Sequence, residues 1–325
     1  MLRPLLALLV AAGIALPQRA PAQAPAWLET WTTCGGVALG RPWHLAFDAA
    51  GRVYCTDMAA RQVLVFTAGG AGAAAWTCPA LAPADFAPAG IAVSAAGVAY
   101  VTTPYPSGPP PFWVTSYTDA GAYLGPFGAM GSDAGQLGQC FDVAVDAAGN
   151  VYLADWNNFR VDVLSPAGAP VAGWGGYGSA PGQFHGPLAL AVSPAGCVYV
   201  TDDDNQRVQE FTASGAFVRQ WGSPGSGPGQ FAGPWGIALD AAGDVYVADS
   251  GNHRIQAFTP TGQFLAQWGT LGSGPGQFDR PTGVGVGPDG RVYVADTWNS
   301  RIQVFGALAT PARTTSWGRL KAAYR

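Results

Sequence analysis

Short apolar runs bounded by turn residues recur along this chain, and they predict β-strands. Between residues 235 and 268 four such runs cover 235–240, 245–249, 254–258 and 263–268. Glycine, asparagine, serine and threonine fill the gaps between them, as they do in hairpin connections. Four short strands joined by tight turns predict one antiparallel sheet of four strands.

This unit is repeated along the chain. A Gly-x-Val-Tyr core ending in aspartate recurs with a spacing of 47 residues at 149–155, 196–202, 243–249 and 290–296. Two weaker copies lie at 51–57 and 97–103. Six tyrosines mark the six units, namely Tyr54, Tyr100, Tyr152, Tyr199, Tyr246 and Tyr293. Six repeated four-stranded sheets predict an all-β, six-bladed β-propeller.

The two ends of the repeat array complement each other. The last unit stops at Phe305 and lacks its fourth strand, whereas residues 26–31 near the N-terminus resemble the fourth strand at 217–221. We therefore predict that the N-terminal strand closes the last blade, which leaves the ring without a free edge. The predicted propeller covers residues 26–306.

Composition supports the same fold class. The chain has 325 residues with 46 glycines and 27 prolines, and 49% of it is hydrophobic. This apolar content excludes a disordered chain. The frequent glycines and prolines exclude a helical bundle, because both residues destabilise helix interiors.

Both ends of the chain differ from the repeats. Residues 1–22 predict a signal peptide, with Arg3 before an apolar stretch at 5–16 that is too short to span a bilayer. We therefore expect a secreted or extracytoplasmic protein without a transmembrane segment. Residues 307–325 form an Ala/Thr/Pro linker and a basic tail. The tail is either a frayed end or a tag that retains the protein at the cell surface.

The charge pattern argues against nucleic acid as a partner. The net charge is −4, but six of the 16 bases lie in the two ends while all 20 acids lie within 29–296. The body therefore carries a charge near −10, which repels phosphate backbones. We expect a monomer that binds neither nucleic acid nor a cofactor.

The unit at 229–258 resembles the NHL repeat, whose core appears as Asn252-His253-Arg254-Ile255. The resemblance covers about 41–305 and is weakest in the second unit. It implies a six-bladed propeller independently of the strand pattern. It does not fix the function, because this fold hosts binding modules, sensors, RNA-binding domains and some enzymes.

Aspartate and arginine recur together in five of the six units, which indicates a scaffold role rather than a catalytic one. A catalytic pair would be expected only once. We expect each pair to tie down the turn between the second and third strands. The predicted pairs are Asp57 with Arg61, Asp155 with Arg160, Asp202 with Arg207, Asp249 with Arg254, and Asp296 with Arg301.

Aromatic residues gather on one predicted face. We call it the top face; it carries the loops that join successive blades and the turns between second and third strands. Exposed aromatic rings around a concave mouth suit a protein, peptide or glycan ligand, bound without catalysis. The alternative for Trp43 and Trp235 is packing between blades. The candidate ligand-binding residues are Trp43, Tyr105, Phe112, Trp113, Trp156, Trp235 and Trp298.

Metal chemistry is the main alternative to this binding hypothesis. The family resemblance extends to peptide-amidating lyases with a three-histidine zinc site, but of His44, His185 and His253 only His44 is predicted to face the axis. The acidic run at 202–204 favours a solvated turn over a calcium site. We expect no metal. The alternative function is a propeller enzyme, a lyase or lactonase-like hydrolase with a metal in the channel.

The chain has five cysteines, Cys34, Cys55, Cys78, Cys140 and Cys197. An odd number leaves at least one thiol unpaired within the chain. Cys34 and Cys78 follow fourth-strand tryptophans in neighbouring blades and are the predicted pair.

Overall fold

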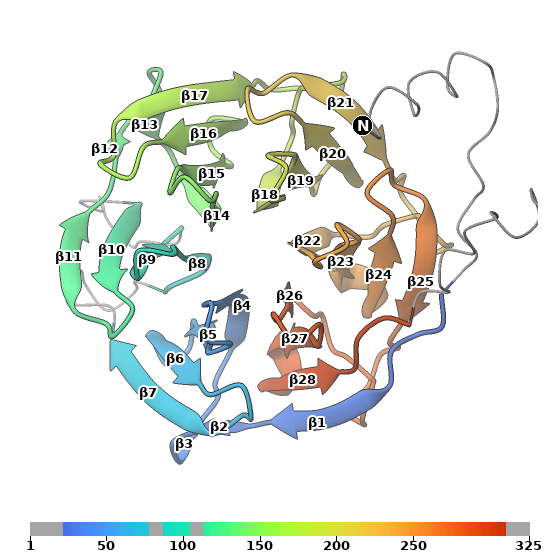
Figure 1. Ribbon diagram of the computed structural model, residues 1–325. Helices are drawn as coiled ribbons and strands as arrows, with labels where there is room; N and C mark the ends of the chain where they lie inside the picture. The colour runs from blue at the N-terminus through green and yellow to red at the C-terminus, as the bar shows by residue number, and fades with distance from the viewer. Residues whose placement is uncertain (1–21, 78–86, 105–112, 310–325) are drawn as a thin grey trace, which may run out of the picture.

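The computed structural model describes residues 22–77, 87–104 and 113–309. Six four-stranded antiparallel sheets are arranged as blades around a central axis (Figure 1). The chain is therefore an all-β, six-bladed propeller, as the repeat predicts. Helical structure in the described residues consists of two short 3-10 turns, η1 (Ser250–Asn252) and η2 (Thr297–Asn299).

Each blade has an innermost strand at the axis and three further strands that follow it outward, in that order. Blade 1 contains β4 (Pro42–Phe47), β5 (Val53–Asp57), β6 (Gln62–Phe66) and β7 (Gly72–Thr77). Blade 2 contains β8 (Ile91–Val93), β9 (Val98–Thr102), β10 (Val114–Thr118) and β11 (Tyr123–Pro126). Blade 3 contains β14 (Cys140–Val145), β15 (Val151–Asp155), β16 (Arg160–Leu164) and β17 (Pro170–Gly175).

Blade 4 contains β18 (Pro187–Val192), β19 (Val198–Asp202), β20 (Arg207–Phe211) and β21 (Phe217–Trp221). Blade 5 contains β22 (Pro234–Leu239), β23 (Val245–Asp249), β24 (Arg254–Phe258) and β25 (Phe264–Trp268). Blade 6 contains β26 (Gly283–Val286), β27 (Val292–Asp296), β28 (Arg301–Phe305) and β1 (Trp27–Trp31). Two small sheets, β2 (Thr33–Cys34) with β3 (Val37–Ala38) and β12 (Ala129–Met130) with β13 (Gln136–Leu137), lie in connections between blades.

The hydrophobic core lies between the blades rather than inside any one of them. Each of the six clusters of buried residues joins side chains of two neighbouring blades. All five residues of β23 are buried, because both faces of this sheet are covered. The mostly apolar second strands therefore pack between blades, and the blades cannot separate without exposing them.

Tryptophans at the ends of the outer strands pack against the next blade. Trp221 lies with its ring centroid 5.9 Å from that of Phe258 in blade 5. Gly262 faces it in a turn with φ +80°, and a Cβ atom there would lie 2.7 Å from the indole. Glycine is therefore required at this turn, both for the backbone angle and for the space.

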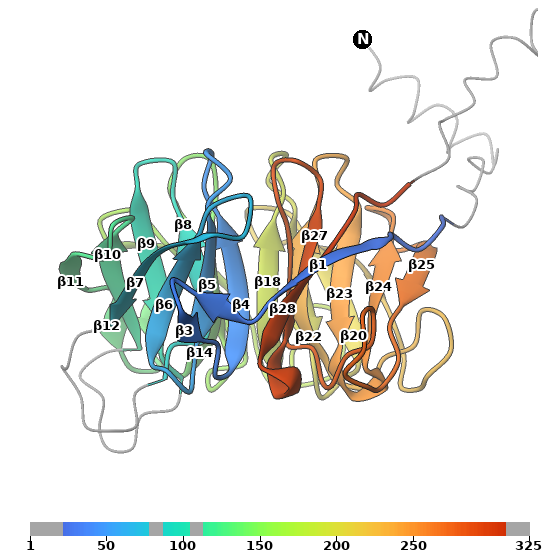
Figure 2. The same cartoon turned by 90° about the horizontal axis from the view of Figure 1, so that it is seen from below.

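The N-terminal strand closes the ring. β1 pairs antiparallel with β28, with Trp27 opposite Phe305 and Trp31 opposite Ile302 (Figure 2). Trp31 is buried, and its ring lies 5.0 Å from that of Phe66 in blade 1 and 5.4 Å from that of Tyr293 in blade 6. The closing strand thus joins the first blade to the last.

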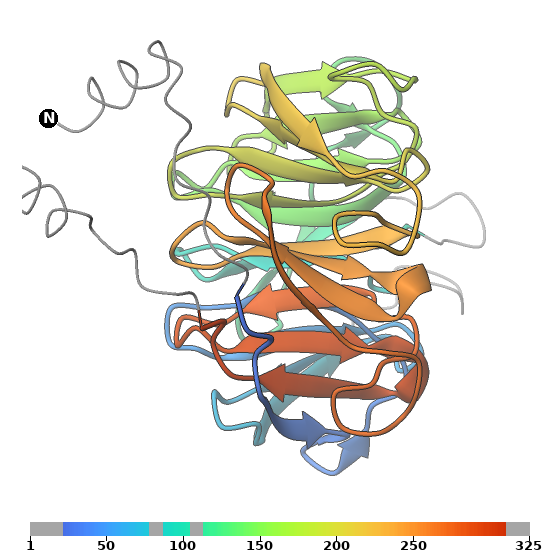
Figure 3. The same cartoon turned by 90° about the vertical axis from the view of Figure 1, so that its right-hand side faces the viewer.

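The connections between strands lie at the two ends of the propeller (Figure 3). On the top face of blades 4 and 5, the connection that enters the blade contacts the following turn, since Asp203 N–H donates to Gly186 O and Ser250 N–H donates to Gly233 O. No helix within the described ranges is long and apolar enough to cross a membrane. Most of the predicted signal peptide and tail lies at 1–21 and 310–325, outside the described residues.

The closing strand provides a matched pair of tryptophans. We expect Trp31→Ala to lower the free energy of unfolding by about 3 kcal/mol or more, because a buried ring between two blades is lost. Trp27→Ala on the same strand should cost below about 1 kcal/mol, since Trp27 is 41% exposed. Urea unfolding of both variants tests this; equal losses would contradict closure through Trp31.

Candidate functional site

A buried carboxylate ties together the two loops of the top face in blade 4. Asp202 is fully buried and accepts the N–H of Gly186 at 3.1 Å from the loop that enters the blade. Arg207 Nε donates to the same carboxylate at 2.9 Å. The other nitrogens of Arg207 donate to the carbonyls of Ser179 and Gln183, each at 2.7 Å. Pairing and hydrogen bonding together offset the cost of burying these charges.

Blades 5 and 6 have the same arrangement. Arg254 Nε lies 2.7 Å from Asp249, and Arg301 Nε lies 2.7 Å from Asp296. Both arginines also donate to carbonyl oxygens of the preceding loop. Three of the five predicted pairs therefore hold the top-face loops in place.

The predicted pair of Asp57 with Arg61 is wrong. Gln62, not Arg61, lies opposite Asp57 in the sheet. Arg61 is the preceding residue, which is exposed and lies in the turn with a φ of 56°. Asp57 instead accepts backbone N–H groups of Gly40 at 2.6 Å and Arg41 at 2.9 Å. The carboxylate still fixes the entering loop, but without an arginine.

The predicted pair of Asp155 with Arg160 is also wrong. Arg160 Nε donates to Asp162 at 2.8 Å. In blade 4 the equivalent of Asp162 is Gln209, so blade 3 has a second carboxylate that captures the arginine. Asp155 accepts the Gly138 N–H at 2.7 Å instead.

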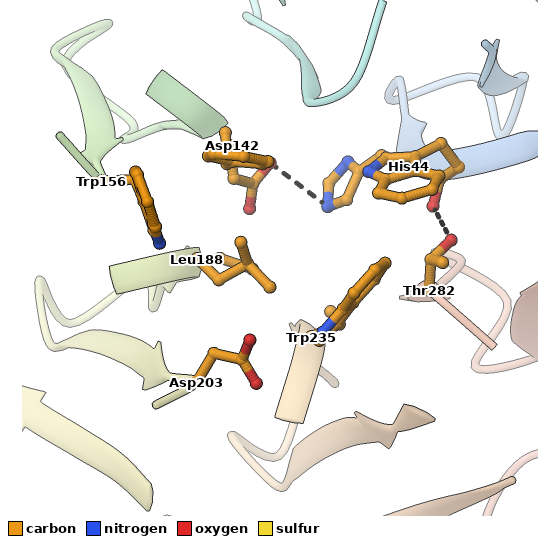
Figure 4. A pocket seen from close by; sticks show the side chains of 11 residues that line it. His44, Asp142, Trp156, Leu188, Asp203, Trp235 and Thr282 are labelled. Atoms are coloured by element: carbon orange, nitrogen blue, oxygen red, sulfur yellow. Dashed lines mark hydrogen bonds and ion pairs between the residues drawn. The ribbon is translucent and has the colours of Figure 1, made fainter. Parts of the chain in front are cut away.

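The loops and inner strands surround a central cavity of about 190 Å³ (Figure 4). Two adjacent positions near the start of the inner strands of blades 1, 3, 4 and 5 supply most of its lining. Thr282 of blade 6 and the residues that follow β15 and β19 supply the rest. The lining consists of Trp43, His44, Phe141, Asp142, Trp156, Leu188, Ala189, Asp203, Trp235, Gly236 and Thr282.

Aromatic rings form opposite walls of this cavity. The rings of Trp43 and Trp235 lie 5.1 Å apart, and those of Phe141 and Trp156 lie 5.9 Å apart. Figure 4 shows Trp156 and Trp235 on opposite sides with Leu188 between them. The walls are therefore apolar, and ring faces and edges are available to a ligand.

His44 and Asp142 lie against each other at the cavity, from blades 1 and 3. His44 Nε2 is 3.3 Å from Asp142 Oδ1, and Asp142 Oδ2 accepts the N–H of Leu190 at 3.0 Å. Burial raises the pKa of Asp142, while His44 and the Leu190 N–H act in the opposite direction. Within the described residues both ring nitrogens of His44 and Asp142 Oδ1 are buried without a hydrogen-bond partner.

The His44 position carries small residues in most blades. A Cβ on Gly236 would lie 2.5 Å from Thr282 O, and one on Gly283 would lie 2.4 Å from Trp43 O. Neighbouring inner strands therefore leave almost no space for side chains here. In blades 1 to 6 this position is occupied by His44, Gly90, Asp142, Ala189, Gly236 and Gly283. Only blades 1 and 3 therefore place a functional side chain there.

Asp203 supplies a second carboxylate to the cavity (Figure 4). Burial, helped by the neighbouring charge of Asp204, raises the pKa of Asp203 to about 6, although a hydrogen bond from the Trp235 side chain opposes the shift. The site thus combines apolar walls with two carboxyl groups, of which Asp142 contacts His44 and Asp203 contacts the Trp235 side chain.

The predicted aromatic residues have different positions. Trp43, Trp156 and Trp235 line the cavity. Trp298 is 40% exposed, with its ring 6.4 Å from that of Trp43. Trp113 is half-buried and packs against the cluster between blades 2 and 3. It does not line the cavity. The candidates Tyr105 and Phe112 lie outside the described residues.

Sequence reasoning missed Phe141, Asp142, Leu188 and Asp203. The signal was present for Asp142, because aligning the units shows a carboxylate where the repeat has glycine or alanine. Phe141 and Leu188 share the alignment position of Trp43. Asp203 stands out in the sequence only as part of an acidic turn.

The other candidate ligands for a metal are dispersed. His253 Nδ1 lies 3.5 Å from Asp279 and accepts the Arg280 N–H at 3.1 Å. His185 is 4.0 Å from Asp204. In the described ranges no three His, Cys, Asp or Glu side chains are grouped so that they could hold a metal ion.

The cysteines that the structure describes are unpaired. Cys34, Cys55 and Cys140 are buried, and burial raises the pKa of all three thiols. Cys197 is partly exposed. The predicted partner of Cys34, Cys78, lies outside the described residues.

Comparison with known proteins identifies the repeat. The NHL repeat model matches residues 231–258 and 278–305, which cover strands of blades 5 and 6. The protein thus carries NHL repeats within a six-bladed β-propeller. No curated protein matches the sequence.

Solved structures resemble the chain in fold. A streptogramin B lyase is 16% identical, with a TM-score of 0.60, covering 88% of this chain and 100% of its own. A gluconolactonase from Xanthomonas campestris is 16% identical with a TM-score of 0.60, covering 91% and 98%. A catalytically inactive histidine-to-alanine variant of virginiamycin B lyase from Staphylococcus aureus, with quinupristin, is 17% identical with a TM-score of 0.55, covering 82% and 80%. At these identities the likeness shows the propeller fold.

The raised pKa of Asp203 predicts a pH effect on stability. Because the pKa of Asp203 is about 6 in the folded state against 3.8 ordinarily, the folded protein binds this proton more tightly. The contribution of Asp203 therefore favours folding below pH about 4 and is lost as pH rises through about 6. In urea unfolding, the free energy of unfolding of wild type should fall relative to that of Asp203→Asn as the pH rises from about 4 through about 6. If wild type instead kept or gained stability relative to Asp203→Asn as the pH rises, a raised pKa of this half-buried carboxyl group would be contradicted.

Proposed function

We propose that this protein is a ligand-binding module that takes one small group of a protein, peptide or glycan ligand into its central cavity. The observation that carries the proposal is the cavity itself, walled by Trp43, Phe141, Trp156 and Trp235. Concave sites with apolar walls and a few polar groups are typical of ligand binding.

The size of the cavity limits what enters it. A volume of about 190 Å³ is smaller than the roughly 300 Å³ at which pockets for drug-sized molecules begin. One side chain or terminal group fits, and the rest of the ligand would lie across the top face, where Trp298 is exposed. The paired loops of blades 4 to 6 supply a rigid frame for this contact.

Export is part of the proposal. The signal peptide predicted at 1–22 would carry the protein out of the cytoplasm, where extracellular peptides and glycans are available. The acidic body supports a partner other than nucleic acid.

The binding proposal predicts that one tryptophan matters and another does not. On peptide and glycan arrays, Trp235→Ala should strongly weaken binding, because one cavity wall loses one of its two indole rings. Trp27→Ala removes an exposed indole from the outer strand β1 and should leave binding unchanged. Retained binding in Trp235→Ala, with its fold checked by circular dichroism, would refute a role for the cavity.

A second candidate function is an enzyme, and the contact of His44 with Asp142 favours it. A carboxylate that orients an imidazole is an arrangement used in acid–base catalysis. The similar folds include a lyase and a gluconolactonase, and a histidine-to-alanine variant of one lyase is inactive. Binding ranks first because both ring nitrogens of His44 are buried away from solvent within the described structure.

The enzyme candidate predicts loss of turnover on substitution of the histidine. Purified protein would be assayed on gluconolactone and on a streptogramin B compound. Any turnover should fall about a hundredfold or more in His44→Gln, as expected for loss of a general base. His185→Gln changes an exposed histidine and serves as the control. Equal rates in wild type and His44→Gln would exclude His44 as the base.

A further inference from the structure

We infer that the central cavity binds a compact organic cation, an alkylated ammonium group. The inference rests on the proposed function and names the chemistry of the group that enters the cavity. It follows from the aromatic walls, the carboxylates between them and the absence of lysine and arginine from the described lining, in which the His44 side chain contacts Asp142.

The walls present aromatic rings at the position where a cation would lie. Trp43 lies beside Trp235 in one wall, and Phe141 lies beside Trp156 in the other. Figure 4 shows Trp156 and Trp235 on opposite sides of the cavity. The electron-rich face of an indole attracts cations, most strongly where water is excluded. Rings on two sides of a cavity of about 190 Å³ can contact one small group simultaneously.

The top face already shows that its indole rings accept cations. Arg41 and Arg280 place their guanidinium groups 5.0 Å and 5.6 Å from the ring centre of Trp298. Among the described residues no arginine or lysine lies over the rings that line the cavity. Those rings therefore remain available to a cation supplied by a ligand.

The charges in the cavity favour the same ligand. Asp142 and Asp203 contribute carboxyl groups, and the described lining contains no lysine or arginine. Burial raises the pKa of both carboxyl groups, although His44 opposes the shift at Asp142 and the Trp235 side chain opposes it at Asp203. His44 contacts one Asp142 oxygen, but Asp203 has no basic side chain beside it in the lining. A bound cation would stabilise both carboxylates.

The polar groups of the cavity fit an alkylated ammonium better than a sugar. A sugar ring carries many hydroxyl groups, and each one buried without a partner costs free energy. Thr282 Oγ1 already bonds to Trp43 O at 2.7 Å and to Thr297 at 2.6 Å. Asp142 Oδ2 already accepts the Leu190 N–H. A fully alkylated, quaternary ammonium has no N–H group, needs no hydrogen-bond acceptor and is held by rings and charge alone.

Calorimetric titration of the purified protein with choline tests the inference. The reference compound is the uncharged alcohol in which carbon replaces the ammonium nitrogen, because it has the same shape without the charge. We expect choline to bind about tenfold or more tightly than this alcohol. Equal affinities, or no binding of choline, would overturn the inference.

Matched substitutions locate the charge that binds. Asp203→Asn should weaken choline binding about tenfold, whereas Asp204→Asn removes an exposed neighbouring charge outside the lining and should change affinity by less than about threefold. Equal effects of the two substitutions would overturn a site in the cavity. Unfolding midpoints of both variants confirm that each is folded.

The two proposals fail in distinguishable ways. If array ligands bind and depend on Trp235 while choline does not bind, the cavity is the site but its ligand group is not a cation. If choline binding is unchanged in Trp235→Leu, the cavity itself is excluded as the site.

Discussion

The close approach of the six inner strands around the axis is the constraint on which the site depends. Gly236 and Gly283 have no space for a Cβ atom, because backbone oxygens of the next blade lie 2.5 Å and 2.4 Å from where it would stand. A functional side chain at this position therefore requires small neighbours. Gly90 fills that role between His44 and Asp142, since its own Cβ would lie 2.6 Å from Asp142 Cα. Two polar side chains from blades 1 and 3 can therefore meet at the axis only because the blade between them has a glycine at this position.

Outside this inner ring, buried charges set the shape of the top face. In blades 4 to 6 an arginine joins a buried aspartate to the carbonyls of the loop that enters the blade. These contacts recur in several blades and give a rigid frame. The cavity differs from that frame, because its carboxyl groups meet aromatic rings rather than arginines. Repeated charge pairs thus hold the scaffold, whereas the carboxyl groups at the centre, Asp142 and Asp203, lie beside no arginine or lysine of the described lining.

The repeat predicted the fold in detail, because regular spacing directly reflects identical blades. Blade count, closure by the N-terminal strand and the bounds of β23 and β24 follow from it. The predicted pair of Asp57 failed because Arg61 lies one residue before the position opposite Asp57, which Gln62 occupies. The predicted pair of Asp155 failed because Arg160 donates to Asp162, which stands where blade 4 has Gln209. Asp142 was missed because its meeting with His44 depends on how blades 1 and 3 approach across the axis. Strand patterns within one repeat do not contain that information.

The most direct test of the account is fluorine NMR of the protein with fluorotryptophan at its 12 tryptophan positions. Resonances would be assigned by single Trp→Phe substitutions, and choline would then be added. We expect the resonances of Trp43, Trp156 and Trp235 to shift together with one dissociation constant, while those of the outer-strand residues Trp76, Trp174 and Trp221 do not shift. Unchanged cavity resonances, or equal shifts at the outer strands, would contradict it.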